Sequence, residues 1–70
     1  MELLAKDPAS GGKGCPSVYI DDTGEFVVQG PALEADAWAK VENPLPGETA
    51  VRISPEIVMA AVERHRQRQA

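Results

Sequence analysis

The first stretch whose residue types suggest chemistry is SGGKGCP, residues 10–16, in which glycines surround a lysine and a cysteine follows. A phosphate-binding loop requires a preceding strand, a Gly-Lys-Ser or Gly-Lys-Thr ending, and a following helix whose amides hold the phosphates. Here Cys15 and Pro16 replace that ending, and the next expected element is a strand. The stretch is therefore interpreted as a linker without a bound phosphate.

Cys15 is the single cysteine of the chain, and His65 is its single histidine. A catalytic thiolate requires a neighbouring base and a pKa lowered by positive charge or by a helix N-terminus. Lys13 is the nearest cation in the sequence, and nothing in the spacing brings His65 next to the thiol. We expect Cys15 to be a small packing residue. A thiol-dependent switch, in which Cys15 oxidises or bridges two chains, is the alternative.

Patterns typical of metal sites are missing from the sequence. One cysteine excludes an intrachain disulfide and leaves a structural zinc site without its ligand set. Asp21, Asp22 and Glu25 lie close together, but a calcium-binding EF-hand spreads its ligands over about twelve residues, with a glycine at the sixth. These carboxylates are interpreted as solvated turn residues. We therefore expect no metal, no cofactor and no catalytic residues, so the chain is not expected to be an enzyme.

The formal charge of −4 is unevenly distributed along the chain. Residues 1–50 carry nine acidic side chains and three lysines, whereas residues 51–70 carry four arginines and two glutamates. An acidic body repels phosphate backbones, which disfavours nucleic-acid binding. Arginine is nevertheless a good phosphate ligand, so weak nucleic-acid binding is kept as an alternative function. The arginines concerned are Arg52, Arg64, Arg66 and Arg68.

Two short segments upstream of these arginines predict a β-hairpin. In SVYID, residues 17–21, and in EFVVQ, residues 25–29, apolar side chains alternate between two faces at period two. The residues between the two segments favour a tight turn, and Gly24 can adopt a positive φ there. Both faces of the second segment are apolar, and Tyr19 adds to the face that carries Val27.

The remainder of the chain predicts a helix, a strand and a second helix. ALEADAWAKV, residues 32–41, places apolar side chains on one helix face, and TAVRI, residues 49–53, has the alternation of a strand. Ser54, Pro55 and Glu56 are typical of a helix start. The expected order is β-β-α-β-α. This is a small α+β domain with a three-stranded sheet, a β-hairpin and a C-terminal amphipathic helix.

Residues 1–14 are predicted to form a flexible N-terminal arm, and residues 15–70 a single small domain. No apolar run approaches the roughly 20 residues of a membrane span. The first residues lack the apolar segment of a signal peptide. We expect a cytoplasmic protein that does not contact a membrane.

A partner is expected, because a chain of 70 residues buries only about 60% of the surface that its unfolded form exposes. One layer of helices cannot cover both apolar faces of the sheet. The predicted cover for the second face is the first helix, the N-terminal arm, a second copy or another protein. Trp38 is a core residue of the first helix in the simplest interpretation and an interface anchor in the alternative one.

The segments GCPSVYIDDTGEFVVQG and LPGETAVRISPEIVMAAV resemble small actinobacterial proteins encoded beside helix-turn-helix regulators of the WhiJ type. The shared features are a glycine-rich lead, a cysteine at the first strand, a hairpin, a valine-rich strand and a Ser-Pro-Glu helix start, over about residues 14–62. The middle segment, PALEADAWAKVEN, matches none of these features. The resemblance implies a non-enzymatic accessory factor that binds or tunes a transcription regulator, and it brings no catalytic residues.

We therefore expect a protein-interaction module whose partner is itself, as a homodimer, or a helix-turn-helix regulator. The apolar excess of the sheet indicates protein–protein contact, and the basic C-terminal segment is expected to tune it. The residues expected to bind the partner are Tyr19, Val27, Trp38, Arg64 and Arg66.

Overall fold

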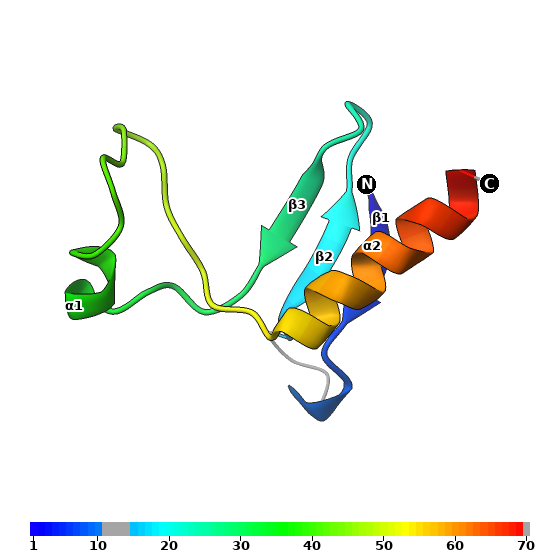
Figure 1. The fold of residues 1–70 in the computed structure, drawn as a ribbon, viewed down its shortest axis with the longest axis horizontal. Coiled ribbons are helices and arrows are strands. Elements are labelled where there is room, and N and C mark those ends of the chain that lie inside the picture. Colours follow the sequence, from blue (N-terminus) through cyan, green and yellow to red (C-terminus); the bar gives the residue numbers. More distant parts are fainter. Residues whose placement is uncertain (11–14, 70) are drawn as a thin grey trace.

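The computed structural model describes residues 1–10 and 15–69 of the chain. They form a three-stranded antiparallel sheet with a long C-terminal helix across one face (Figure 1). This confirms the expected α+β class with its hairpin and C-terminal helix. In chain order the elements are β1 (Glu2–Lys6), the short 3-10 helix η1 (Pro8–Ser10), β2 (Ser17–Ile20), β3 (Phe26–Gln29), α1 (Ala35–Trp38) and α2 (Pro55–Gln69).

The β2–β3 hairpin is confirmed, and its turn is held by the side chain of Asp21. One Asp21 carboxylate oxygen accepts hydrogen bonds from the Thr23 hydroxyl at 2.6 Å, the Thr23 amide at 2.9 Å and the Glu25 amide at 3.1 Å. These bonds, the Thr23 hydroxyl first, lower the pKa of Asp21. Gly24 has φ 88°, a left-handed conformation that favours glycine. The predicted solvated turn carboxylate is thus also the group that fixes the turn.

The third strand of the sheet is β1 and not the segment at 49–53, which corrects the expected order of elements. β1 pairs antiparallel with β2, although residues 2–6 were expected to belong to a flexible arm. Its register shifts between Leu3 and Ala5, so that the extra residue, Leu4, enters the core. That buried leucine stabilises the N-terminal strand. Of the rest of the expected arm, Pro8–Ser10 form η1, and residues 11–14 lie outside the described residues.

Residues 49–53 make only an isolated bridge, between Val51 and Ala32. Pro31, in the facing segment, has no amide to donate, so its carbonyl only accepts a bond from the Arg52 amide at 2.9 Å. The chain then enters α2 at once, because Ser54 and Pro55 begin that helix. A longer ladder has no room to form.

The core lies between α2 and the two strands β1 and β2. It consists of Leu4, Val18, Ile57 and Ala61, and Ala61 is completely buried. A small side chain at this position lets the helix backbone approach the sheet closely. The helix begins at Pro55, as predicted. At this start the Ser54 hydroxyl donates a hydrogen bond to the Glu56 carboxylate, which lowers the pKa of Glu56.

Residues 30–53 form an extension that projects from the sheet on the side of β3 (Figure 1). The helix expected at 32–41 is confined to α1, because Leu33 donates its amide to the Ala50 carbonyl and is thereby held in the extended stem. Gly30 is required where the extension leaves the sheet, since a Cβ there would lie 2.4 Å from the Arg52 carbonyl oxygen. The α1 helix contacts none of the other helices or strands of the described chain.

The close approach of α2 to the sheet predicts a strong size limit at position 61. Replacing Ala61 with methionine should lower the free energy of unfolding by about 1–3 kcal/mol, because the larger side chain must push the helix away. Ala60, its exposed neighbour, provides the matched control, and Ala60→Met should change stability little. Urea unfolding followed by circular dichroism measures both variants. Equal midpoints for the two would contradict the described packing.

Candidate interaction site

One face of the sheet is left without a covering helix in the described chain. Val18 points toward α2 as part of the core, so strand alternation places Tyr19 on the opposite face. The cross-strand partners of Tyr19 are Leu3 in β1 and Val27 in β3. Leu3 is 43% exposed and Val27 is 36% exposed. These three residues, Leu3, Tyr19 and Val27, form a surface that we call the open face.

The polar end of Tyr19 is satisfied within the sheet. Its hydroxyl donates a hydrogen bond to the Gln29 side-chain oxygen at 2.7 Å. A partner that covers the ring therefore meets no unsatisfied donor, and the ring contributes apolar area. The predicted contact residues Tyr19 and Val27 thus lie side by side on one surface.

Trp38 lies elsewhere, in α1 at the outer part of the extension (Figure 1). It is partly exposed, and α1 packs against no other helix or strand of the described residues. The structure therefore does not bring Trp38 together with Tyr19 and Val27. The sequence analysis assigned Trp38 to the same interface as Tyr19 and Val27, because residue patterns do not show how far the extension projects from the sheet.

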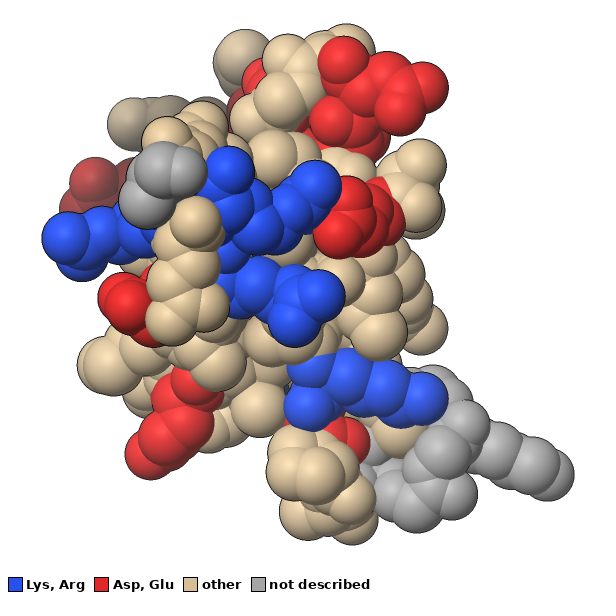
Figure 2. All heavy atoms as spheres, turned by 90° about the vertical axis from the view of Figure 1, so that its right-hand side faces the viewer, with Lys and Arg blue, Asp and Glu red and all other residues tan. Residues whose placement is uncertain are grey.

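The basic residues gather at the C-terminal part of α2, on the side of the molecule shown in Figure 2. Arg64 and Arg66 are exposed and make no ion pair with other described residues. Arg68, in contrast, pairs with Glu2 at 2.7 Å, and Arg52 pairs with Glu34 at 2.7 Å. Two of the four candidate phosphate ligands are thus neutralised within the molecule.

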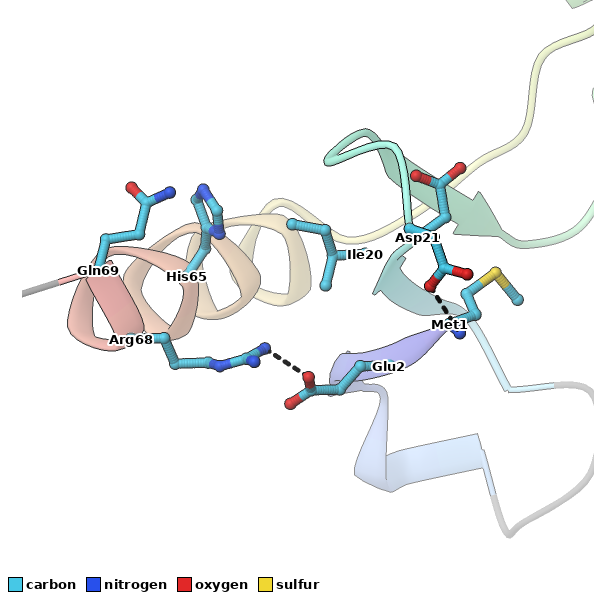
Figure 3. Close-up of a pocket in the computed structure, with 8 residues that line it drawn as sticks. Met1, Glu2, Ile20, Asp21, His65, Arg68 and Gln69 are labelled. Atoms are coloured by element: carbon cyan, nitrogen blue, oxygen red, sulfur yellow. Dashed lines mark ion pairs between the residues drawn. The ribbon is translucent and has the colours of Figure 1, made fainter.

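An open hollow of about 480 Å³ lies between the hairpin turn, the start of β1 and the end of α2 (Figure 3). The Glu2–Arg68 ion pair crosses it, and the amino group of Met1 lies 3.9 Å from the Asp22 carboxylate. Its described lining also includes the Asp21 carboxylate and the His65 ring. Two of its three carboxylates, Glu2 and Asp22, are thus paired with cations, whereas the Asp21 carboxylate accepts the hydrogen bonds of the hairpin turn.

Cys15 and His65 do not form the pair that thiol catalysis would need. Cys15 is buried and free. The His65 ring instead makes an edge-to-face contact with Phe26, with ring centroids 5.4 Å apart. In the described part of the chain, no group of three potential metal-binding side chains is present.

The sequence pattern missed a second apolar surface, on the helix side of β3. Phe26 and Val28 are 39% and 42% exposed there. His65 contacts Phe26, so the helix positions three and seven residues earlier, Val62 and Val58, lie on the same side of α2. Each is 37% exposed. We call these four residues, Phe26, Val28, Val58 and Val62, the β3 shelf.

The width of one helix explains the β3 shelf. Strands lie about 4.8 Å apart, and a helix with its side chains is about 10 Å wide, so one helix covers two strands and not three. In the described chain the α2 helix packs on β1 and β2 and reaches β3 through the His65 contact with Phe26, which leaves Phe26 39% and Val28 42% exposed. The sequence predicted two helices, enough to cover three strands, and did not show that α1 packs away from the sheet.

No family model, curated protein or solved structure matches this chain. Among the described residues, no helix is both long and apolar enough to cross a bilayer. The function is therefore inferred from the surfaces described above and from the sequence resemblance.

The stem of the extension contains a bidentate ion pair with a testable pH dependence. The Arg52 guanidinium donates to both oxygens of Glu34, at 2.8 and 2.7 Å. These bonds, the backbone amide of Glu34 and the arginine charge lower the Glu34 pKa from 4.5 to about 2. Because the folded pKa lies below the ordinary value, the pair contributes fully above pH 4.5 and is lost as the pH falls through about 2.

We expect the side-chain carboxyl carbon of Glu34 to titrate with a midpoint of about 2 in carbon-13 NMR. In Arg52→Gln the midpoint should rise toward 4.5, because the hydrogen bonds and the positive charge are removed. Lys40→Gln removes another cation of the extension and serves as the control, with no change expected. A midpoint near 4.5 in the unmodified chain would show that the pair does not form in solution.

Proposed function

We propose that this chain is a non-enzymatic protein-interaction module that binds a transcription regulator through the open face. The observation that carries the proposal is the exposure of Leu3 and Val27 on either side of Tyr19, in the middle of a sheet. Large apolar side chains on a rigid sheet face are typical of a protein contact surface. The burial of Cys15 and the packing of His65 on Phe26 support a binding role rather than thiol catalysis.

The open face offers enough apolar surface to anchor a partner. Fully burying one leucine, valine or aromatic side chain contributes about 1.5–3 kcal/mol, before the entropic cost of association. Tyr19 has the properties of a central anchor, because its hydroxyl is held by Gln29 and its ring is presented on the surface. The partner surface that fits is apolar, with a polar rim.

A helix-turn-helix regulator is the partner that the sequence resemblance supports. Such a regulator acts on DNA, so the complex would form in the cytoplasm of a bacterial cell. The free cations Arg64 and Arg66 form a basic region that would attract acidic groups of the regulator. We infer that these arginines tune the rate of association and that the open face supplies the affinity.

The alternatives receive less support from the structure. Two of the four arginines expected to bind nucleic acid, Arg68 and Arg52, instead form ion pairs with Glu2 and Glu34. A thiol switch requires that Cys15 be accessible, and the side chain is only 4% exposed.

Charge substitutions on the open face test the proposal. Tyr19→Asp and Val27→Asp should each weaken binding to a WhiJ-type helix-turn-helix regulator from the same genome by about 100-fold or more, because a carboxylate is desolvated in the interface. Tyr19→Phe keeps the ring and should bind within a few-fold of the unmodified chain. Isothermal titration calorimetry measures the affinities, and circular dichroism confirms that each variant is folded.

Thr49→Asp adds the same charge to an exposed residue of the extension and is the matched control. It should leave the affinity unchanged. If the Tyr19→Asp variant is folded and binds as tightly as the control, the open face is not the binding surface.

The role of the basic region is tested separately. A double variant, Arg64→Gln with Arg66→Gln, should lower the association rate and reduce its dependence on salt, while the dissociation rate stays similar. Stopped-flow binding at two ionic strengths measures both rates. An unchanged association rate would remove the two arginines from the proposal.

A further inference from the structure

Among the described strands β3 lies at an edge of the sheet, and none of them pairs with its outer side. The strand order is β1-β2-β3, so β3 has a neighbour on one side only. The Asp21 amide donates to the Glu25 carbonyl, so Asp21 and Glu25 form a hydrogen-bonded pair. Along an antiparallel ladder such pairs alternate with non-hydrogen-bonded pairs, so the next pair, Ile20 with Phe26, is a non-hydrogen-bonded one. With Ile20 opposite Phe26 and Val18 opposite Val28, the backbone groups of Phe26 and Val28 point away from β2.

The two edges of the sheet differ in how they are protected. β1 carries charged residues at both ends, Glu2 and Lys6, and a bulge at Leu4 interrupts its register. Charges and bulges are the usual means by which an edge strand avoids pairing with other chains. β3 has the sequence FVVQ, with no charge, no proline and a regular register along its whole length. Its edge is therefore suited to strand pairing.

The β3 shelf lies along the same edge. Phe26 and Val28 expose both their outward backbone groups and a large part of their side chains. Val58 and Val62 extend this apolar surface on α2. An occupant that only pairs with the backbone would leave the shelf exposed. The partner that suits this edge is a strand whose protein also has apolar side chains on the helix side of the sheet, where they can cover the β3 shelf.

A second copy of this chain supplies such a strand, and we propose that β3 pairs antiparallel with β3 of a second copy about a two-fold axis at Val27. The outward amide and carbonyl of Phe26 then form hydrogen bonds with those of Val28 in the other copy. The two-fold axis generates a second, identical pair from Val28 and Phe26 of the other copy. The two shelves lie next to each other on the helix side of a six-stranded sheet. Glu25 faces Gln29 of the other copy, so no two carboxylates are opposed.

Two further observations favour a second copy over an unrelated strand. The buried apolar set of the described chain is small: Leu4, Cys15, Val18, Ile57 and Ala61. Chains of this size commonly require a disulfide, a metal or oligomerisation for stability, and a second copy is available whenever the chain is made. The extension also projects on the β3 side (Figure 1), so each extension would lie beside the other copy.

The proposed dimer goes beyond the proposed regulator binding, because it uses the edge and the shelf rather than Tyr19. The ring of Tyr19 lies on β2, one strand away from the two-fold axis. Tyr19→Asp should therefore lose the regulator and remain dimeric. Val27 belongs to the open face and also lies at the proposed two-fold axis, so Tyr19→Asp, and not Val27→Asp, separates the two proposals.

Light scattering after size exclusion tests the dimer. The unmodified chain should have twice the chain mass of 7.5 kDa, with or without reductant. Val28→Pro should be monomeric, because proline removes an amide that points outward and leaves the β2–β3 ladder intact. Val28→Thr keeps the amide and the β-branched shape, so it should remain a dimer. A monomeric unmodified chain, or a folded dimeric Val28→Pro variant, would overturn the proposal.

Cross-linking tests the register without depending on the proline variant. Val27→Cys places two thiols opposite each other at the axis, in a non-hydrogen-bonded pair. Oxidised glutathione should therefore link them at least about tenfold faster than in Gln29→Cys, which faces Glu25 of the other copy. The unmodified chain controls for the buried Cys15 and should not cross-link. Equal rates for the two variants would exclude this register.

Discussion

The contact between α2 and the first two strands is the interaction on which the rest of the structure depends. Ala61 is completely buried against the sheet, and Val18 is 1% exposed beneath the helix. One helix is wide enough for two strands, so this contact stabilises β1 and β2 and leaves β3 exposed. The open face and the β3 shelf both follow from it.

These two surfaces differ in the kind of partner that they suit. The open face is a side-chain surface centred on Tyr19, whose hydroxyl is already bonded to Gln29, and it suits another apolar surface. The β3 edge offers unpaired backbone groups as well as apolar side chains, and it suits a strand. Under the two proposals, a second copy pairs with the β3 edge and a regulator covers the open face, and Val27 belongs to both contacts.

Three carboxylates hold local structure in the described chain through hydrogen bonds. Asp21 closes the hairpin turn, Glu34 holds the stem of the extension through Arg52, and Glu56 accepts from Ser54 at the start of α2. In each case hydrogen bonding to the charged form lowers the carboxyl pKa. The Asp21 bonds lie within the turn and the Ser54 bond at the start of α2, whereas the Glu34–Arg52 pair joins residues that are 18 apart in the sequence.

The sequence by itself determined the features that depend on neighbouring residues. The Asp21 to Gly24 turn, the alternation of the hairpin and the start of α2 at Pro55 were predictable, because turn and capping preferences act within a few residues. Only the tertiary structure decided that residues 2–6 form the third strand and that residues 49–53 do not. Both outcomes depend on long-range packing, since Leu4 gains a place in the core under α2 while Val51 finds only the proline-interrupted segment around Ala32.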